Sequence, residues 1–379
     1  MGEYTPTADR RVPALDGLRG LAGLMVVISH YFGEVDHGLH ATMFGWMGVD
    51  IFFVLSGFLI GKLILEKKDC ANFFVVFYVR RCLRIIPSYL LTLVVCAVLL
   101  AVLPAAWAEN PHTVPLWTYF AFLQVFPMVS SGSVGAHWLN PTWTLAVEEH
   151  FYLVIPALIV FTPRRYLANV FLAMIPLALC LRVAALEYHL WPPMSAYVLL
   201  PFRLDTLACG LLAATMVNAG VALDRHMLAI RLTPLAALIA TLCARLASPL
   251  MFEVYGPFLM GIGLAALILC LVVDAPEAQR FKSPLLRKIG DNTYCLYLVH
   301  VPVLGLMHGF ILGTPPDLVT GAQWAVTLAA LPVTAILTYL MTTYIEMPIT
   351  AHGRHWKWST QKRSAQYSEV LRRPKADPI

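Results

Sequence analysis

Charged residues are scarce in this chain, and their scarcity excludes most soluble folds. Only 13% of the 379 residues are Asp, Glu, Lys or Arg, against about 25% in a typical soluble domain, and 59% are hydrophobic. The formal net charge of +5 comes from cations that lie beside apolar segments, which is not the pattern of a nucleic-acid-binding protein. The composition therefore predicts an all-α polytopic membrane protein.

Two further absences narrow the possibilities. The eight cysteines form no Cys-x-x-Cys pair, and most fall inside apolar runs, so we expect small buried side chains and no metal site. No Ala-x-Ala cleavage site follows the first apolar run, and charged residues lie within it, so we do not expect a cleaved signal peptide.

The apolar segments predict the topology. About eleven of them approach the length needed to cross a bilayer. They centre near residues 18–33, 43–65, 86–106, 114–128, 142–161, 167–186, 195–218, 227–247, 251–274, 292–313 and 322–346. The segment 114–128 is the shortest and lacks Lys and Arg on both flanks, so we expect it to be re-entrant or interfacial. About ten transmembrane helices remain, and the positive-inside rule then places both termini in the cytoplasm.

Residues 1–350 are therefore predicted to form one transmembrane domain. Residues 351–379 are polar and basic, and we expect a cytoplasmic tail that lies on the surface or is disordered. Arg182 and Arg245 lie near segment ends, where their side chains are expected to reach the membrane surface.

The most informative stretch runs from Arg19 to His30. Eleven residues of helix rise about 16 Å in about three turns, so these two side chains lie on nearly one face. Ionisable residues within a spanning helix are costly and usually face a functional interior. His30 is a natural general base for a hydroxyl, and the alternative is a hydrogen-bonded histidine of the core.

Carboxylates occur at similar depth in two other segments. Asp50 is placed to orient His30, and its alternative role is a helix N-terminal charge stabilised by the dipole. Glu148 and Glu149 are adjacent and cannot both be comfortably ionised without cations. We expect one to line a polar cavity and the other to be protonated or paired, with a structural ion pair as the alternative for each.

Three arginines cluster where the third segment begins. Arg80, Arg81 and Arg84 share one sector of a helix at the predicted cytoplasmic entrance. The guanidinium fork suits phosphate oxygens, which favours a site for a phosphorylated cytosolic donor. The alternative is anchoring to anionic lipid.

The later segments also carry polar residues. Arg203 and Asp205 are two residues apart and cannot face one another on a helix, so each needs a partner elsewhere, in a shared cavity. Tyr297 and His300 are one turn apart and are expected to face the same interior.

Four motifs resemble, in order and spacing, those of the acyltransferase 3 family. They are Leu15-Asp-Gly-Leu-Arg-Gly-Leu-Ala…His30, Gly48-Val-Asp-Ile-Phe-Phe-Val-Leu-Ser-Gly-Phe-Leu-Ile60, Phe77-Tyr…Arg-Arg…Arg84-Ile-Ile-Pro87 and Trp143-Thr-Leu-Ala-Val-Glu-Glu-His-Phe-Tyr152. Arg203-Leu-Asp205 and Gly290-Asp-Asn-Thr-Tyr-Cys-Leu-Tyr-Leu-Val-His300 look like its later motifs. The resemblance covers about residues 10–350.

The resemblance implies a multi-pass inner-membrane enzyme that moves an acyl group, commonly acetyl, from cytosolic acyl-CoA to a hydroxyl. Its acceptors include surface polysaccharides and lipid-linked glycans, with a small natural product such as a macrolide as the alternative. Acyl-CoA is then a substrate, and no permanently bound cofactor or metal is expected. Membrane lipid is an expected partner and nucleic acid is not. Members with a fused hydrolase-like domain exist, and this chain fits the stand-alone type.

The family's site residues carry over by position. Its Arg-ten-His element corresponds to Arg19 and His30, its arginine cluster to residues 80–84, and its acidic position to Glu148. Thr144 stands where members often have Ser, which keeps the hydroxyl. His30, oriented by Asp50 or a Glu, is expected to deprotonate the acceptor.

Several alternatives stay open at this point. An acyl-enzyme on His30 competes with direct transfer, and Ser56 is a weaker nucleophile candidate that is also suited to packing beside Gly57. A proton-coupled exporter that uses His30 and Glu148 with Arg203 and Asp205 as a relay belongs to another functional class. The absence of a visible repeat weighs against it. Four aromatic residues are candidates for sugar stacking or for ordinary interface positions, namely Trp107, Trp117, Tyr119 and Trp138.

Overall fold

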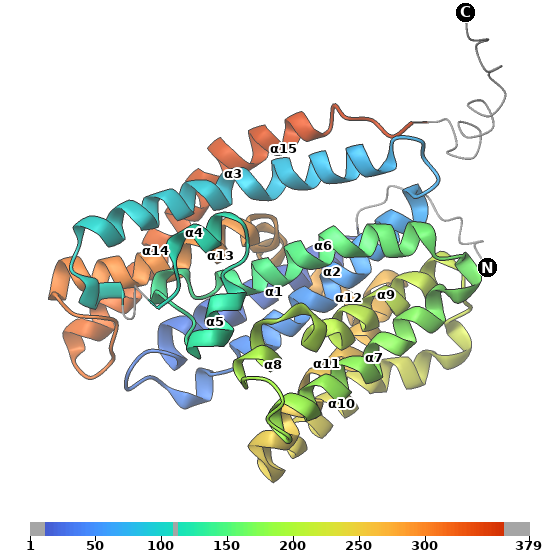
Figure 1. The fold of residues 1–379 in the computed structure, drawn as a ribbon, viewed down its shortest axis with the longest axis horizontal. Helices are drawn as coiled ribbons and strands as arrows, with labels where there is room; N and C mark the ends of the chain where they lie inside the picture. The colour runs from blue at the N-terminus through green and yellow to red at the C-terminus, as the bar shows by residue number, and fades with distance from the viewer. Residues whose placement is uncertain (1–11, 109–112, 360–379) are drawn as a thin grey trace, which may run out of the picture.

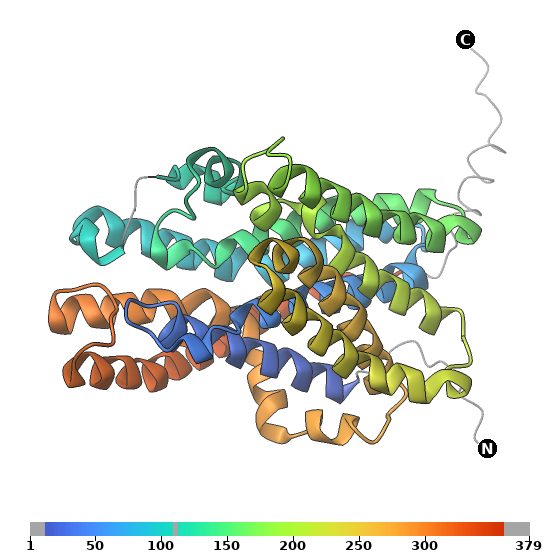
Figure 2. The same cartoon turned by 90° about the horizontal axis from the view of Figure 1, so that it is seen from below.

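The computed structural model describes residues 12–108 and 113–359, and within those ranges it is helical and contains no β-strand (Figure 1). The long helices run side by side along one direction of the molecule, as the two views in Figures 1 and 2 agree. They are α1 (Pro13–Ile28), α2 (Gly45–Lys67), α3 (Phe73–Val102), α6 (Thr142–Phe161), α7 (Arg164–Leu186), α9 (Leu204–Asn218), α10 (Met227–Ala247), α11 (Pro249–Val272), α13 (Pro284–Leu312) and α14 (Gly321–Met341).

The predicted topology agrees with these helices. Nine of the described helices are long and apolar enough to cross a membrane, and they match nine of the ten predicted crossings. The tenth is α1, which continues without a break into a π-helical turn, η1 (Ser29–Gly33). Segment 114–128 instead holds two short helices, α4 (Leu116–Phe120) and α5 (Val125–Ser131). Neither is long enough to cross, which confirms that this segment is not a spanning helix.

Burial separates inner helices from outer ones. In α2, 67% of the most apolar stretch is buried, against 11% in α10. The outer helices expose large apolar side chains, including Leu246, which is 87% exposed. Because such a surface is unfavourable in water and suited to lipid, the exposed apolar faces agree with a membrane-embedded bundle.

Glycines set the closest helix contacts. A Cβ on Gly20 would collide with the backbone of α13, and one on Gly290 would collide with the backbone of α1. Gly57 and Gly210 bring α2 and α9 together in the same way. Small residues let membrane helices approach closely, so packing can compensate for the missing hydrophobic drive. Helix α1 is thereby fixed between α2 and α13.

The beginning of the predicted tail packs on the outside of the bundle. The short helix α15 (Met347–Gly353) lies beside α3 in Figure 1. Asn72 then donates to the Lys357 carbonyl at 3.0 Å and accepts from the Ser359 amide at 2.8 Å. Trp358 stacks on Phe73 with ring centroids 5.9 Å apart. Residues 360–379 lie outside the described part.

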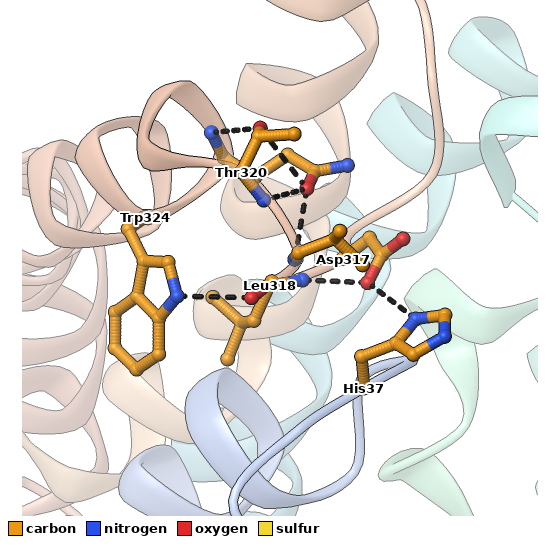
Figure 3. Close-up of polar contacts among 7 residues, drawn as sticks. His37, Asp317, Leu318, Thr320 and Trp324 are labelled. Atoms are coloured by element: carbon orange, nitrogen blue, oxygen red, sulfur yellow. Dashed lines mark hydrogen bonds and ion pairs between the residues drawn. The ribbon is translucent and has the colours of Figure 1, made fainter.

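The loop after η1 is attached to the loop before α14. His37 Nδ1 and Asp317 Oδ1 are 3.1 Å apart, and Asp317 also accepts from the Leu318 amide at 2.6 Å (Figure 3). The Trp324 indole donates to the Leu318 carbonyl at 2.9 Å. These contacts hold the segment that follows His30 at the end of the bundle.

The cysteines are less uniform than predicted. All eight are free thiols, and only Cys96, Cys209, Cys270 and Cys295 are buried. Three others, Cys82, Cys180 and Cys243, are exposed on α3, α7 and α10.

Candidate active site

A polar cavity lies between α1, α2, α3, α6 and α13. Arg19 from α1 and Arg81 and Arg84 from α3 line it together, and we call it the arginine cavity. Of the predicted arginine cluster, Arg81 and Arg84 are thus present, and Arg19 joins them. The other polar lining residues of the cavity are Ser56, Thr144, Glu148, Glu149, Tyr152, Asp291, Thr293, Tyr294, Tyr297 and Glu346.

Arg80 points elsewhere, although the sequence grouped it with Arg81 and Arg84. Its guanidinium donates from Nε and Nη2 to the Trp356 carbonyl, at 3.0 and 2.7 Å, and lies 5.2 Å from the centroid of the Trp358 ring. The helix turns 100° per residue, so neighbouring arginines diverge by that angle. In this structure Arg80 holds the end of the described chain against α3.

Glu148 is the best-connected carboxylate of the arginine cavity. Ser56 Oγ donates to its Oε1 at 2.5 Å, and the Tyr152 hydroxyl donates to its Oε2 at 3.2 Å. Arg81 lies 5.4 Å from the centroid of the Tyr152 ring. Ser56 therefore orients a carboxylate, a role that its place beside Gly57 did not suggest.

A chain of aromatic and imidazole rings leads from this cavity to His30. The Tyr297 hydroxyl, in the cavity wall, is 2.7 Å from Thr144 Oγ1. The His300 ring is centred 5.7 Å from that of Tyr297 and 5.0 Å from that of His30. Tyr297 and His300 thus face the same interior, as predicted.

The backbone of the His30 turn is unusual. The Glu34 amide donates to the Ser29 carbonyl at 2.8 Å, the i to i+5 bond that defines a π-helix. Such turns are rare and often occur at functional sites. The second π-helical turn of the described chain, η7 (Thr342–Glu346), brings Glu346 into the arginine cavity.

The hydrogen bonds assign the protons of both imidazoles. His30 Nδ1 is 2.9 Å from the Val26 carbonyl, and His300 Nδ1 is 3.1 Å from the Leu296 carbonyl, so each Nδ1 carries the donated hydrogen. His300 Nε2 then accepts from His30 Nδ1 at 3.4 Å. This arrangement leaves the lone pair of His30 Nε2 available as a base, 3.6 Å from Glu34 Oε2.

The carboxylate beside His30 is Glu34, which corrects the expectation that Asp50 orients it. Ser29 Oγ donates to Glu34 Oε1 at 2.7 Å and fixes the side chain. Asp50 is buried and pairs with Arg203, whose Nη1 lies 3.9 Å from its Oδ1. The i to i+4 spacing of His30 and Glu34 is visible in the sequence, but Glu34 lies just beyond the first predicted apolar segment, 18–33.

A second cavity lies at the same end of the bundle as His30, and we call it the aromatic cavity. Its walls combine the Asp50–Arg203 pair with four rings, those of Trp46, Trp143, Tyr197 and Phe252. The aromatic residues singled out from the sequence are placed differently. Trp138 and Tyr119 are almost fully buried in the core, whereas Trp117 is 67% exposed.

Asp205 lines neither cavity. It is fully buried and forms a two-oxygen ion pair with Arg182, which also donates to the carbonyls of Phe202 and Val254 at 2.5 and 2.8 Å. Arg182 is 1% exposed, so the expectation that it reaches the membrane surface is wrong. Asp205, in the first turn of α9, gives Arg182 a partner inside the bundle.

Comparison with known proteins finds O-acetyltransferases among the relatives. A Listeria monocytogenes protein named peptidoglycan O-acetyltransferase OatA is 28% identical over 382 residues, which cover 93% of this chain and 58% of that protein. A Bacillus subtilis protein, provisionally named as the peptidoglycan O-acetyltransferase YrhL, is 30% identical over 374 residues, or 91% of this chain and 56% of that protein. The chain thus spans less than two thirds of the length of these relatives. No solved structure matches it.

The family match agrees with the site. The acyltransferase domain description covers residues 12–343, from the first turn of α1 into η7, and so includes both cavities and the His30 turn. The resemblance carried by the Arg19 and His30 motif and by the Glu148 motif extends over nearly the whole chain. This polytopic membrane protein belongs to the acyltransferase 3 family.

Proposed function

We propose that this chain is a membrane O-acyltransferase that moves an acyl group, most simply acetyl, from acyl-CoA to a hydroxyl of a carbohydrate. One observation supports the proposal above all others. Arg19, which lines the arginine cavity, and the base His30 belong to one continuous helix formed by α1 and η1. Thr144, Tyr297 and His300 connect the cavity with His30 through the bundle interior.

The arginine cavity is suited to the coenzyme. Arg19, Arg81 and Arg84 provide fixed positive charge and forked donors for phosphate oxygens. They belong to the basic end of the bundle, which the positive-inside rule places in the cytoplasm, where acyl-CoA is made. In this proposal the flexible pantetheine arm extends from the arginines past Ser56 and Glu148 toward Tyr297.

His30 supplies the base. Its Nε2 removes the proton of the acceptor hydroxyl while the hydroxyl oxygen attacks the thioester carbonyl carbon. A new ester C–O bond forms, the C–S bond breaks, and the coenzyme leaves as a thiolate that takes up a proton. Glu34 stabilises the imidazolium formed at His30, because its carboxylate lies 3.6 Å from Nε2.

The acceptor is inferred from the relatives and from the position of His30. Two relatives are named peptidoglycan O-acetyltransferases, which makes a cell-wall glycan the first acceptor to test. Glu34 is 36% exposed at the end of the bundle opposite the arginines, so an acceptor can approach from that side. With the arginines in the cytoplasm, that side is extracytoplasmic and the host membrane is the bacterial inner membrane.

The test has a cellular arm and a purified arm. Surface glycans from a deletion strain, and from strains complemented with the wild type or with His30→Ala, are compared by mass spectrometry. Loss of an acetyl-sized or larger ester, restored by the wild type alone, supports the proposal. In detergent, the purified wild type is expected to release free CoA from acetyl-CoA. An unchanged glycan together with no CoA release would contradict it and favour a transporter.

A further inference from the structure

The aromatic cavity has a composition that neither helix packing nor the donor explains. Its residues come from the first parts of α2, α6 and α11, from the end of α7, from α8 (Met194–Val198) and from η5 (Leu200–Arg203). Glu253 of α11 adds a second carboxylate to the wall. The cavity volume is about 370 Å³, against about 130 Å³ for the arginine cavity. A volume of this size falls in the range of small-ligand sites.

The ion pair in this cavity differs from an ordinary structural pair. Asp50 is 4% exposed and Arg203 is 8% exposed, yet their closest atoms are 3.9 Å apart, beyond hydrogen-bond distance. Buried charges are costly unless geometry and hydrogen bonds compensate for lost hydration. The neighbouring Arg182–Asp205 pair meets that condition and lines no cavity. The Asp50–Arg203 pair lines the aromatic cavity without a hydrogen bond between its two members, and Arg203 Nε donates instead to the Tyr197 carbonyl at 3.1 Å.

The rings are arranged around this pair. Arg203 lies 5.7 Å from the Trp143 centroid and 5.4 Å from the Tyr197 centroid, and Trp46 packs edge-on against Phe252 at 5.0 Å. Sugar rings present apolar C–H faces that stack on aromatic rings and hydroxyls that bind carboxylate and guanidinium groups. An acyl chain would instead offer no hydrogen-bond partner to Asp50 or Arg203.

The cavity adjoins the catalytic turn. Gly45, one residue before Trp46, packs so closely on η1 that an added Cβ would lie 3.4 Å from Glu34 Oε1. Val49 is part of both cavity walls.

We propose that the aromatic cavity binds a glycosyl unit of the acceptor, stacked on Trp46 and Trp143 and hydrogen-bonded to Asp50 and Arg203, beside the hydroxyl that His30 deprotonates. This inference rests on the proposed function, because it assigns the acceptor half of that reaction. The site selects the acceptor and makes no contact with the coenzyme.

The experiment uses the full chain in detergent with acetyl-CoA and chitotetraose, a soluble oligosaccharide of N-acetylglucosamine. Binding is measured by calorimetry, and CoA release and ester formation are measured with each substrate varied. The variants are Trp46→Ala and Asp50→Asn, with Trp117→Ala as the matched control, because Trp117 is exposed and lies outside both cavities. Tyr197→Ala is added because its half-exposed side chain can be removed without opening the core.

We expect chitotetraose affinity to fall at least tenfold in the Trp46, Asp50 and Tyr197 variants, with the KM for acetyl-CoA unchanged within twofold. The control is expected to match the wild type in both measurements. Unchanged affinity in all three variants, or no binding of chitotetraose by the wild type, would overturn the inference. A wild type that releases no CoA from acetyl-CoA would instead contradict the proposed function, so the two failures are distinguishable.

Discussion

The arginine cavity and the aromatic cavity lie in one bundle and share the wall residue Val49, yet their side chains differ in charge and in aromatic content. The first gathers three cations and several carboxylates around a small volume, and the second surrounds one loose ion pair with rings in a larger volume. The His30 turn packs against Gly45, next to the aromatic cavity, and contacts Tyr297 of the arginine cavity through His300. The difference suggests that a single membrane domain can present an anionic donor and a neutral, ring-shaped acceptor to the same base from opposite ends.

The largest effect on acyl transfer is expected when the proposed base His30 is removed. His30→Ala should lower acyl transfer by about 10²–10⁴-fold, the usual contribution of a general base. The KM for acetyl-CoA should change little, because His30 lies outside the arginine cavity. Initial rates of ester formation measure the effect, and the thermal midpoint in detergent confirms folding. Near wild-type rates in the folded variant would refute the role of His30.

The next prediction tests whether the buried Arg182–Asp205 ion pair has a structural role. Arg182→Met leaves the Asp205 carboxylate buried without its partner, which should cost about 3–5 kcal/mol of unfolding free energy. The double variant Arg182→Met with Asp205→Leu should recover most of that loss, because no uncompensated charge remains. Thermal unfolding in detergent measures both. Equal loss of stability in the single and double variants would show that the pair itself, and not the stranded charge, carries the energy.

The third effect separates donor binding from acceptor binding. Arg81→Ala with Arg84→Ala should raise the KM for acetyl-CoA by about 10–100-fold, as expected for lost hydrogen bonds to charged groups. Arg80→Ala is the matched control, since its side chain contacts Trp356 and Trp358 outside the cavity. An equal rise of the KM in the Arg80 variant would favour lipid anchoring as the role of all three arginines.

The smallest expected effect concerns Glu34, a positioning residue that acts through His30. Glu34→Gln removes a partly exposed anionic partner, so kcat should fall by roughly fivefold while both KM values stay constant. Glu34→Asp should retain part of the rate. Asp50→Asn should show the opposite split, with a raised KM for the acceptor, and identical kinetics for the two variants would remove the distinction between the roles of Glu34 and Asp50.

The sequence predicted helices and their order well, because length and hydropathy are local properties. It identified segment 114–128 as one that does not cross, from its length and its uncharged flanks. It also grouped Arg80, Arg81 and Arg84 from helical periodicity, and two of these three, Arg81 and Arg84, share a cavity with Arg19.

Partners across the bundle were harder to predict. The sequence predicted Asp50 beside His30, and only packing placed Asp50 against Arg203 and Glu34 against His30. Arg182 looked like a surface cation because its position along α7 is near an end, but α9 brought Asp205 to it. Four aromatic residues from separate helices form the aromatic cavity, and no spacing in the sequence connects them.

By itself the sequence determined that this chain spans a membrane many times and carries an arginine and a histidine on one helical face, because these follow from composition and from the 3.6-residue period. Tertiary structure alone decided which charged side chains pair tightly, which line a cavity, and which carboxylate lies beside His30. The physical reason is that a buried charge is stabilised by its partners in three dimensions, and those partners come from other helices whose approach depends on side-chain packing.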